Sequence, residues 1–255
     1  MQIIGNGFLA RNLAEHLSDR HPHVTAIAAG VSWTHSRSLE DFDREAALLT
    51  DTVAEHLHSG RTIVFFSTAA GGMYGNRLST GTECGPVFPR TAYARHKLAL
   101  ESMLARSGMR WLILRLTHVV GHGQPRHQLL PALTEQVRSG RVTLYRGAHR
   151  DLLDVRDLGW LIDRLLVKGV HDEVINVASG TPEPVERIVE AIEARLGTVA
   201  EKAVVDRPAQ NGPLRIARLR ELVPEIDERG FERDYLTQLI TRYVPAGTNR
   251  TRKGT

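Results

Sequence analysis

The chain has 255 residues, of which 42% are hydrophobic and 24% are charged, a composition typical of a soluble globular protein with one sizeable core. Its apolar runs stay far below the roughly 20 residues that span a bilayer. The single cysteine, Cys84, excludes an internal disulfide framework and fits a reducing compartment. The formal net charge of +4 comes from scattered basic residues without interleaved aromatic ones. We therefore expect a cytoplasmic protein that binds neither a membrane nor nucleic acid.

The first half of the chain alternates between strand-like and helical patterns. Ser38 is a suitable N-cap for the second helix, and glycines end the second and third helices at Gly60 and Gly108. Strands that alternate with helices of this length predict an α/β fold with a parallel, helix-covered sheet. Buried strands are predicted at residues 1–5, 23–32, 61–68 and 111–121, and helices at residues 8–20, 38–60 and 91–108.

From about residue 124 the predicted elements become shorter and are separated by loops rich in proline and glycine. We interpret this part as a small substrate lobe, residues 124–245, interleaved with the last strands of the main sheet. Residues 246–255 are expected to form a flexible basic tail. Helices are predicted at residues 129–140, 157–169 and 184–197, and brief strands at 142–147 and 174–179.

The segment GNGFLA, residues 5–10, joins the first predicted strand to the first helix and has the pattern G-x-G-x-x-A. Glycines there allow a tight turn and a close approach to a pyrophosphate, whose charge is favoured at a helix N-terminus. Ordinary strand–helix junctions also use glycine turns, but the position of this one favours a dinucleotide site within residues 1–123. Its expected cofactor contacts are Gly5, Gly7, Phe8 and Leu9.

A tyrosine and a lysine lie four residues apart in the third helix, at Tyr93 and Lys97, and therefore share one helix face. A phenol with an ordinary pKa of about 10 is a poor base at neutral pH, but a nearby ammonium can lower that pKa by roughly 1–3 units. Such a tyrosine can exchange a proton with an alcohol while hydride moves to or from its carbon. The pair therefore predicts acid–base chemistry next to a nicotinamide.

Two hydroxyl side chains, Ser67 and Thr68, end the third predicted strand. In a parallel sheet the carboxyl ends of the strands open into the ligand crevice. A hydroxyl there can hydrogen-bond the same substrate oxygen that Tyr93 protonates. We expect Thr68 to take part in catalysis and Ser67 to bind substrate.

Several motifs follow the glycine turn in a fixed order along the chain. They are "STAAGGMYG", "PRTAYARHK", "LILRLTHVVGHGQP", "RDLLDVRDLG" and "INVASGTPEPV". This ordered set resembles the extended short-chain dehydrogenase/reductases, in particular the NAD-dependent epimerase/dehydratase family that acts on nucleotide sugars. The similarity covers the chain to about residue 220.

The resemblance implies a Rossmann-like, doubly wound sheet and roles for individual residues. Thr68, Tyr93 and Lys97 match the catalytic hydroxyl, the acid/base tyrosine and the lysine, which also contacts the nicotinamide ribose. Arg150 matches an arginine that contacts the diphosphate of a sugar nucleotide, and Arg207 resembles another in that role. His118 replaces a common asparagine and is expected to contact substrate. The resemblance also implies a homodimer formed through the second and third helices.

One departure from the family pattern concerns the adenine side of the cofactor. The first helix leads directly into a strand, residues 23–32, that resembles the fourth strand of the family. We infer that strands two and three are missing, together with the residue that contacts the adenosine ribose. Ala29, Gly30 and Ser32 would still flank the pyrophosphate and nicotinamide. NAD or NADP is the expected cofactor. Each 1.4 kcal/mol lost is about tenfold in Kd, so the missing contacts predict weak binding, a pocket borrowed from a neighbouring subunit, or the loss of redox chemistry.

A second departure concerns the reaction. Ala69 and Ala70 follow Thr68, where 4,6-dehydratases of the family carry an Asp-Glu pair. The sequence therefore favours an epimerase or ketoreductase acting on a nucleotide-linked sugar, and does not separate the two. The alternative is a non-redox relative that binds a sugar nucleotide or a regulatory ligand without a dinucleotide.

Three histidines, His118, His122 and His127, lie in one predicted loop. Their spacing matches no recognised zinc pattern, and no cysteine accompanies them. We expect no metal site there.

Overall fold

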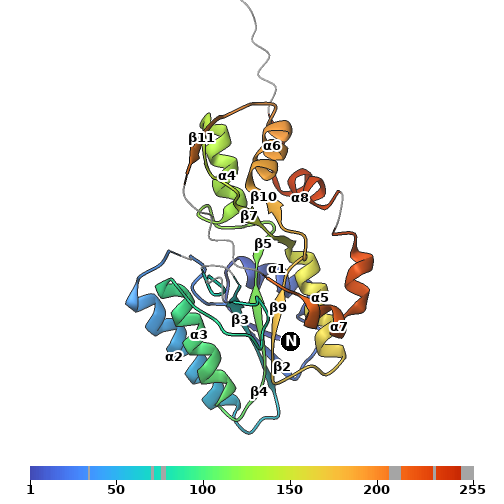
Figure 1. Ribbon diagram of the computed structural model, residues 1–255. Coiled ribbons are helices and arrows are strands. Elements are labelled where there is room, and N and C mark those ends of the chain that lie inside the picture. The colour runs from blue at the N-terminus through green and yellow to red at the C-terminus, as the bar shows by residue number, and fades with distance from the viewer. Residues whose placement is uncertain (34, 70–71, 76–78, 207–213, 232–233, 248–255) are drawn as a thin grey trace, which may run out of the picture.

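The computed structural model describes residues 1–33, 35–69, 72–75, 79–206, 214–231 and 234–247. Its centre is a five-stranded parallel sheet in the order β1-β2-β3-β4-β9 (Figure 1). The parallel strands between helices confirm the predicted Rossmann-like α/β fold. The strands are β1 (Gln2–Ile4), β2 (Val24–Ile27), β3 (Thr62–Thr68), β4 (Arg110–Leu116) and β9 (Glu173–Val177).

The sheet is covered by helices on both faces because its strands are apolar on both sides (Figure 1). Along β3, Ile63 and Phe65 pack with α2 (Leu39–His56) and α3 (Ala92–Ala105). The alternate residues, Val64 and Phe66, belong to the opposite core, together with α1 (Phe8–Leu17) and α5 (Val155–Val167). The period of two along the strand thus separates the two cores.

The smaller lobe sits above the sheet in Figure 1 and consists of short elements around a continuation of the same core. Three two-stranded sheets organise it: β5 (His118–Val120) with β8 (Leu152–Asp154), β6 (Arg141–Tyr145) with β11 (Glu201–Val205), and β7 (His149–Arg150) with β10 (Glu183–Pro184). Its helices are α4 (Leu129–Arg138), α6 (Val185–Leu196) and α8 (Tyr235–Tyr243). The chain returns to the main sheet through α5 and β9 and then enters the lobe again for β10, α6 and β11. It comes back to β9 with α7 (Ala217–Leu222), which the 3₁₀ helix η1 (Pro224–Arg229) follows.

The predicted single strand at residues 111–121 is wrong, because the structure divides it at Thr117. β4 ends at Leu116, and the Thr117 hydroxyl donates to the Asp151 carbonyl at 2.8 Å. That contact turns the chain out of the main sheet, so β5 pairs with β8 instead. The segment reads as one strand despite Arg115, Thr117 and His118, and only the change of partner strand marks its division.

The edge of the main sheet bears on the predicted loss of two strands. Among the described residues, β1 pairs only with β2, and the chain passes from α1 to β2 without an intervening strand. This order places the glycine turn at the outer edge of the sheet. It agrees with a sheet that has no strands on the adenine side.

Candidate active site

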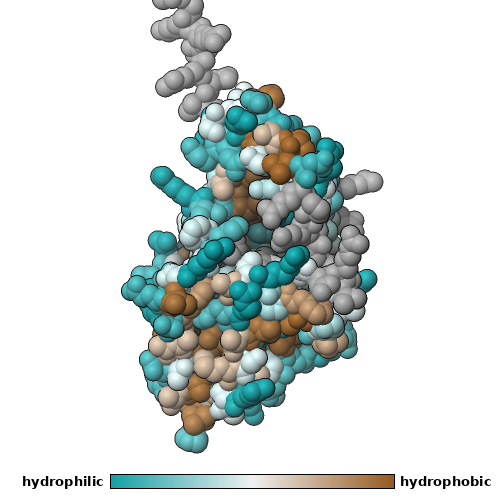
Figure 2. Space-filling model, turned by 60° about the vertical axis from the view of Figure 1, so that its left-hand side comes forward, coloured by the Kyte–Doolittle hydropathy of each residue, from teal (hydrophilic) through white to brown (hydrophobic). Residues whose placement is uncertain are grey.

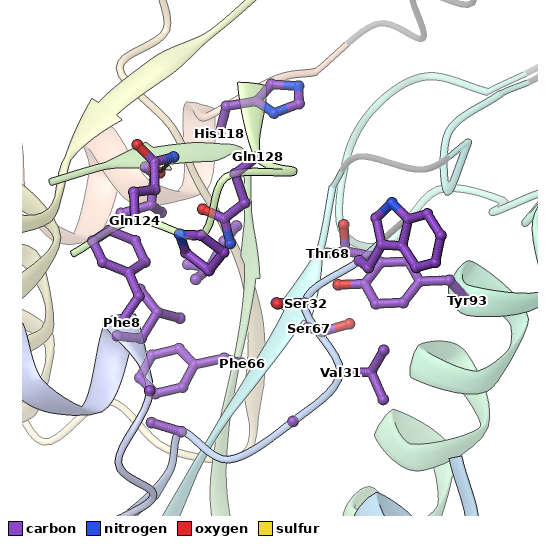
Figure 3. Close-up of a pocket in the computed structure, with 18 of the residues that line it drawn as sticks. Phe8, Val31, Ser32, Phe66, Ser67, Thr68, Tyr93, His118, Gln124 and Gln128 are labelled. Carbon is purple, nitrogen blue, oxygen red and sulfur yellow. Dashed lines mark hydrogen bonds between the residues drawn. The ribbon is translucent and has the colours of Figure 1, made fainter. Parts of the chain in front are cut away.

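A cavity of about 270 Å³ lies at the carboxyl ends of the sheet strands. Its walls come from the turn after β1, the loop after β2, the end of β3, the start of β5 and the loop that leads into α4. Figure 3 shows the Thr68 and Tyr93 oxygens on one side, with Gln124 and Gln128 facing them from the other. The position agrees with the crevice expected at the strand ends of a doubly wound sheet.

The predicted catalytic residues come together at one wall of this cavity. Thr68 is the last residue of β3, and Tyr93 and Lys97 occupy successive turns of α3. The helix begins there because the Thr91 hydroxyl, at its N-cap, accepts a hydrogen bond from Ala94 N at 3.0 Å. The phenol of Tyr93 is buried and hydrogen-bonded to Thr68. Lys97 lies behind it, with Nζ 5.8 Å from the centre of the tyrosine ring.

The expected lowering of the Tyr93 pKa is wrong for this structure. Burial raises the pKa of Tyr93 above its ordinary value, and this effect exceeds the lowering by the Lys97 charge. The carboxylate of Glu45 raises the pKa further, and the hydrogen bond with Thr68 lowers it. Tyr93 is therefore a protonated phenol at neutral pH.

Lys97 is held by two acceptors beneath the cavity. Its Nζ donates to Glu45 Oε1 at 2.5 Å and to the Phe66 carbonyl at 3.1 Å. The lysine is buried and is not among the residues that line the cavity. The lysine–carboxylate contact was absent from the sequence prediction.

Ser67 uses its hydroxyl in a buried network. It donates to Glu101 Oε1 at 2.5 Å, and Arg115 binds the same carboxylate with Nη2 2.6 Å from Oε2. Arg115 also donates to the phenol of Tyr74 at 2.8 Å. Ser67 still contributes to the cavity wall, so its predicted contact with substrate stays a prediction.

The glycine turn has the geometry expected for a close backbone approach. Gly5 has a φ of 131°, and a Cβ there would lie 2.6 Å from the Ala28 carbonyl oxygen and 3.0 Å from Ala29 N. Gly7 is the N-cap of α1, with open space where a Cβ would project and no side-chain cap bond. The first N–H groups of α1 are thus left for another acceptor.

The predicted cofactor residues are distributed unevenly around the cavity. Gly7, Phe8, Leu9 and Gly30 line it. Gly5 and Ala29 lie behind the wall, where they pack against each other. Gly30 has an additional neighbour that the sequence did not indicate, because the Glu45 carboxyl group lies against it.

His118 and Arg150 lie close together at the lobe side, where Arg150 is outside the cavity lining. His118 lines the cavity, and burial lowers its pKa to about 4, assisted by the charge of Arg150. His118 is therefore neutral at physiological pH, while Arg150 supplies the positive charge. Arg207, the second predicted diphosphate contact, lies outside the described residues.

The three histidines of the predicted loop point to different neighbours. His122 contacts the ring of Tyr243, and His127 contacts that of Trp33. Within the described part of the chain, no group of three or more potential metal ligands is assembled. No helix there is long and apolar enough to cross a membrane.

Sequence reasoning missed Glu45. Glu45 lies on the buried face of α2 with Phe42 and Leu49, three positions before and four after it. A carboxylate in an apolar helix stripe needs a buried partner, and this pattern could have marked it. Trp33 lines the cavity with its side chain half exposed.

The fold and the site together define a Rossmann-like protein of the short-chain dehydrogenase/reductase type. The sequence model of the NAD dependent epimerase/dehydratase family matches residues 3–178. The chain therefore belongs to this family.

One curated relative is dTDP-6-deoxy-L-talose 4-dehydrogenase (NAD(P)(+)) of Kitasatospora kifunensis, which is 27% identical over 146 residues. The match covers 51% of this chain and 45% of that relative, so this chain aligns with less than half of the length of the relative.

Solved structures share the fold. RMD from Pseudomonas aeruginosa complexed with NADPH superimposes with a TM-score of 0.72 at 21% identity, over 87% of this chain and 91% of that chain. UDP-N-acetylglucosamine 4-epimerase from Methanobrevibacter ruminantium M1, in complex with UDP-N-acetylmuramic acid, superimposes with a TM-score of 0.74 at 17% identity. The match covers 94% of this chain and 96% of that chain.

The family implies a nicotinamide dinucleotide, and the residues present fit its diphosphate and nicotinamide end. The uncapped N-terminus of α1 and the open space at Gly7 suit a phosphate. The first turn of α1 carries no acidic residue that would repel one. Tyr93 and Thr68 lie along the same cavity, where the reacting end would reach them.

Proposed function

We propose that the protein transfers hydride between a nicotinamide dinucleotide and a carbinol or ketone carbon of a nucleotide-linked sugar. The observation that carries this proposal is the hydrogen-bonded pair of Thr68 and Tyr93 at the cavity wall, with Lys97 behind it. These groups come from β3 and α3, two elements fixed by the core.

The residues of the chain would handle the proton in this reaction. NAD or NADP, when bound, accepts or supplies the hydride. The Thr68 hydroxyl would hold the sugar oxygen, and the Tyr93 phenol would exchange a proton with it. The Lys97 ammonium would stabilise the phenolate left after the proton is given to a ketone oxygen.

The protonation state of Tyr93 supports reduction of a ketone as the favoured first step. Burial raises its pKa, so the proton that a reduced ketone oxygen needs is already present at neutral pH. The described residue after Thr68 is Ala69, which offers no carboxylate for eliminating water. The protonated phenol supports a ketoreductase, and the missing carboxylate supports a ketoreductase or epimerase over a 4,6-dehydratase.

The lobe side of the cavity supports a diphosphate group in the substrate. Arg150 would supply the charge, and His118, neutral at pH 7, would supply a hydrogen bond. Nucleotide sugars carry a diphosphate between the sugar and the nucleoside. The sugar end would then point toward Thr68 and Tyr93.

Activity assays with purified protein test the proposal. dTDP-6-deoxy-L-talose with NAD⁺ or NADP⁺, and UDP-galactose and UDP-N-acetylglucosamine with product analysis, cover oxidation and epimerisation. Y93F should lower turnover by about 10²- to 10⁴-fold, because it removes the proton donor. Y145F, at an exposed tyrosine of β6, is the matched control and should leave turnover unchanged. Equal turnover in Y93F and wild type would contradict the mechanism.

A second candidate is a non-redox relative that binds a sugar nucleotide without a dinucleotide. The position of β1 at the sheet edge favours it, because the described residues offer no strand beyond β1 to hold an adenosine. Titration of the protein with NADH and NADPH, followed by dinucleotide fluorescence, separates the two candidates. Saturable binding supports hydride transfer, whereas no binding up to millimolar dinucleotide supports the second candidate.

We also propose that the protein is a homodimer formed through α2 and α3. The two helices lie side by side on one face of the sheet (Figure 1). Figure 2 brings this side forward and shows apolar patches among the polar residues of the lower half. Small exposed side chains at Ala47, Ala54 and Ala99 allow close helix packing. Light scattering after gel filtration should give twice the chain mass.

A further inference from the structure

The carboxylate of Glu45 lies directly behind the proposed acid–base residues. It projects from α2, and its side chain is 1% exposed. One oxygen accepts from Lys97 Nζ at 2.5 Å, and the other is 3.0 Å from His96 Nε2 and accepts from Val31 N at 3.1 Å. The carboxylate therefore joins α2 to two residues of α3 and to the loop after β2.

The backbone at Gly30 is shaped around this carboxylate. A Cβ at position 30 would lie 2.8 Å from Glu45 Cδ and 2.9 Å from Lys97 Nζ. Such distances are shorter than real carbon contacts, so a larger residue at position 30 would separate the pair. Gly30 thus makes the contact between Glu45 and Lys97 possible, in addition to lining the cavity.

Two opposite charges act on the Tyr93 phenol. Lys97, on the same helix, lowers the pKa of Tyr93, and Glu45, from α2, raises it. From β3, the phenol meets the neutral hydroxyl of Thr68. Glu45 in turn faces His96 as a second hydrogen-bonding neighbour. The pKa of the Tyr93 phenol therefore depends on both Glu45 and Lys97.

We propose that Glu45 is a positioning residue: it holds the Lys97 ammonium at the end of β3 and opposes the action of that ammonium on the Tyr93 phenol. This role rests on the proposed function of Tyr93. The assignment concerns residues of this chain alone and does not depend on the identity of the sugar.

The titration of Tyr93 tests this role without substrate or dinucleotide. Protein labelled with ¹³C at the tyrosine ring gives a signal for Tyr93, assigned by its loss in Y93F. In E45Q the Lys97 ammonium acts without opposition, so Tyr93 should titrate at a pH lower by roughly one to two units. E55Q, which neutralises an exposed carboxylate of the same helix, should leave the titration unchanged.

A second variant covers the case in which E45Q fails to fold. G30A keeps both charges but displaces the carboxylate from the ammonium, and should shift the titration in the same direction by less. An unchanged or higher titration pH of Tyr93 in whichever of the two variants folds would overturn the proposal. If Glu45 had only a structural role, E45Q would lower the melting temperature and leave the titration pH of Tyr93 unchanged.

The activity assay distinguishes this proposal from the proposed function. Absence of hydride transfer in the wild-type protein would count against the function while leaving the Tyr93 titration to decide the role of Glu45. If the wild type is active, its kcat can be measured against pH, and one limb of that profile should report the ionisation of Tyr93. E45Q should shift this limb to lower pH by as much as it shifts the NMR titration of Tyr93. A rate loss without that movement would overturn the assigned role.

Discussion

Helix α3 carries two buried ion pairs one turn apart, and they face different surroundings. Lys97 meets Glu45 at 2.5 Å, and Glu101 meets Arg115 at 2.6 Å. All four side chains are at most 5% exposed. The first pair acts on Tyr93, which lies at the cavity, whereas the second pair lies one turn deeper in the fold.

The second pair extends into a network of neutral partners. Glu101 accepts from Ser67, and Arg115 donates to Tyr74, whose phenol donates to Asn176 at 2.6 Å. This network joins α3, β3, β4 and β9. Burial and pairing are thus alike in the two pairs, and the neighbours decide whether a pair influences chemistry or stability.

The largest expected effect is at the deeper pair. R115M leaves the Glu101 carboxylate buried without its cation, and should lower the free energy of unfolding by about 3–5 kcal/mol. Urea denaturation followed by circular dichroism measures this change. R110M, at an exposed arginine of the same strand, is the control and should change stability little.

A double variant sharpens this result. E101M/R115M removes both charges, so it should be less destabilised than R115M alone. A double variant that is as unstable as R115M would show that the loss comes from packing or from the neutral partners, and not from an unpaired charge.

The next effect is the acid sensitivity of the first pair. Burial by itself raises the pKa of Glu45, but hydrogen bonds from His96 and the charge of Lys97 outweigh it and lower the pKa to about 2. A depressed folded-state pKa stabilises the fold above the ordinary value of 4.5, and this contribution is lost as the pH falls toward 2. The loss is about 3 kcal/mol for a shift of 4.5 − 2 = 2.5 units.

Urea denaturation at pH 5 and pH 3 measures about 2 kcal/mol of this loss, because the carboxylate of the folded state is still ionised at pH 3. E45Q should lose less stability between the two pH values than the wild type, because it has no carboxylate to protonate. Equal losses in E45Q and the wild type would place the acid sensitivity elsewhere in the chain.

The smallest expected effect is at the ends of the two helices that carry the first pair. Ser38 caps α2 by accepting from Asp41 N at 3.1 Å, and Thr91 caps α3 in the same way. S38A and T91A should each lower the free energy of unfolding by about 1 kcal/mol. Thermal unfolding measures both, and S102A, at an exposed serine within α3, is the control.

Much of the central fold could be predicted from the local pattern. The periodicity of the apolar residues located α1, α2 and α3 and the strands between them, and the N-cap at Ser38 is confirmed. The pattern also indicated α4, α5 and α6 in the lobe. It failed at residues 111–121, where one strand-like segment contributes to two sheets, and it did not indicate β11 or α8. Those elements depend on partners that lie far away in the sequence.

The candidate site was predictable in part for the same reason. Tyr93 and Lys97 share a helix face by spacing alone, and Thr68 ends a strand whose carboxyl end opens into the cavity. The apolar stripe of α2 could have marked Glu45 as buried, but its contact with Lys97 could not be read from the sequence, because it depends on how α2 packs beside α3.

The sequence by itself determined the alternation of strands and helices, the glycine turn and the helical spacing of the acid–base pair, since these follow from the local periods of two and about 3.6 residues. Only the tertiary structure decided the charge environment of that pair. Burial and the carboxylate of Glu45, which lies 52 residues before Lys97 in the chain, together raise the pKa of Tyr93, whereas spacing on one helix predicted the opposite. Burial and long-range electrostatic contacts exist only once the chain is folded, so no local pattern encodes them.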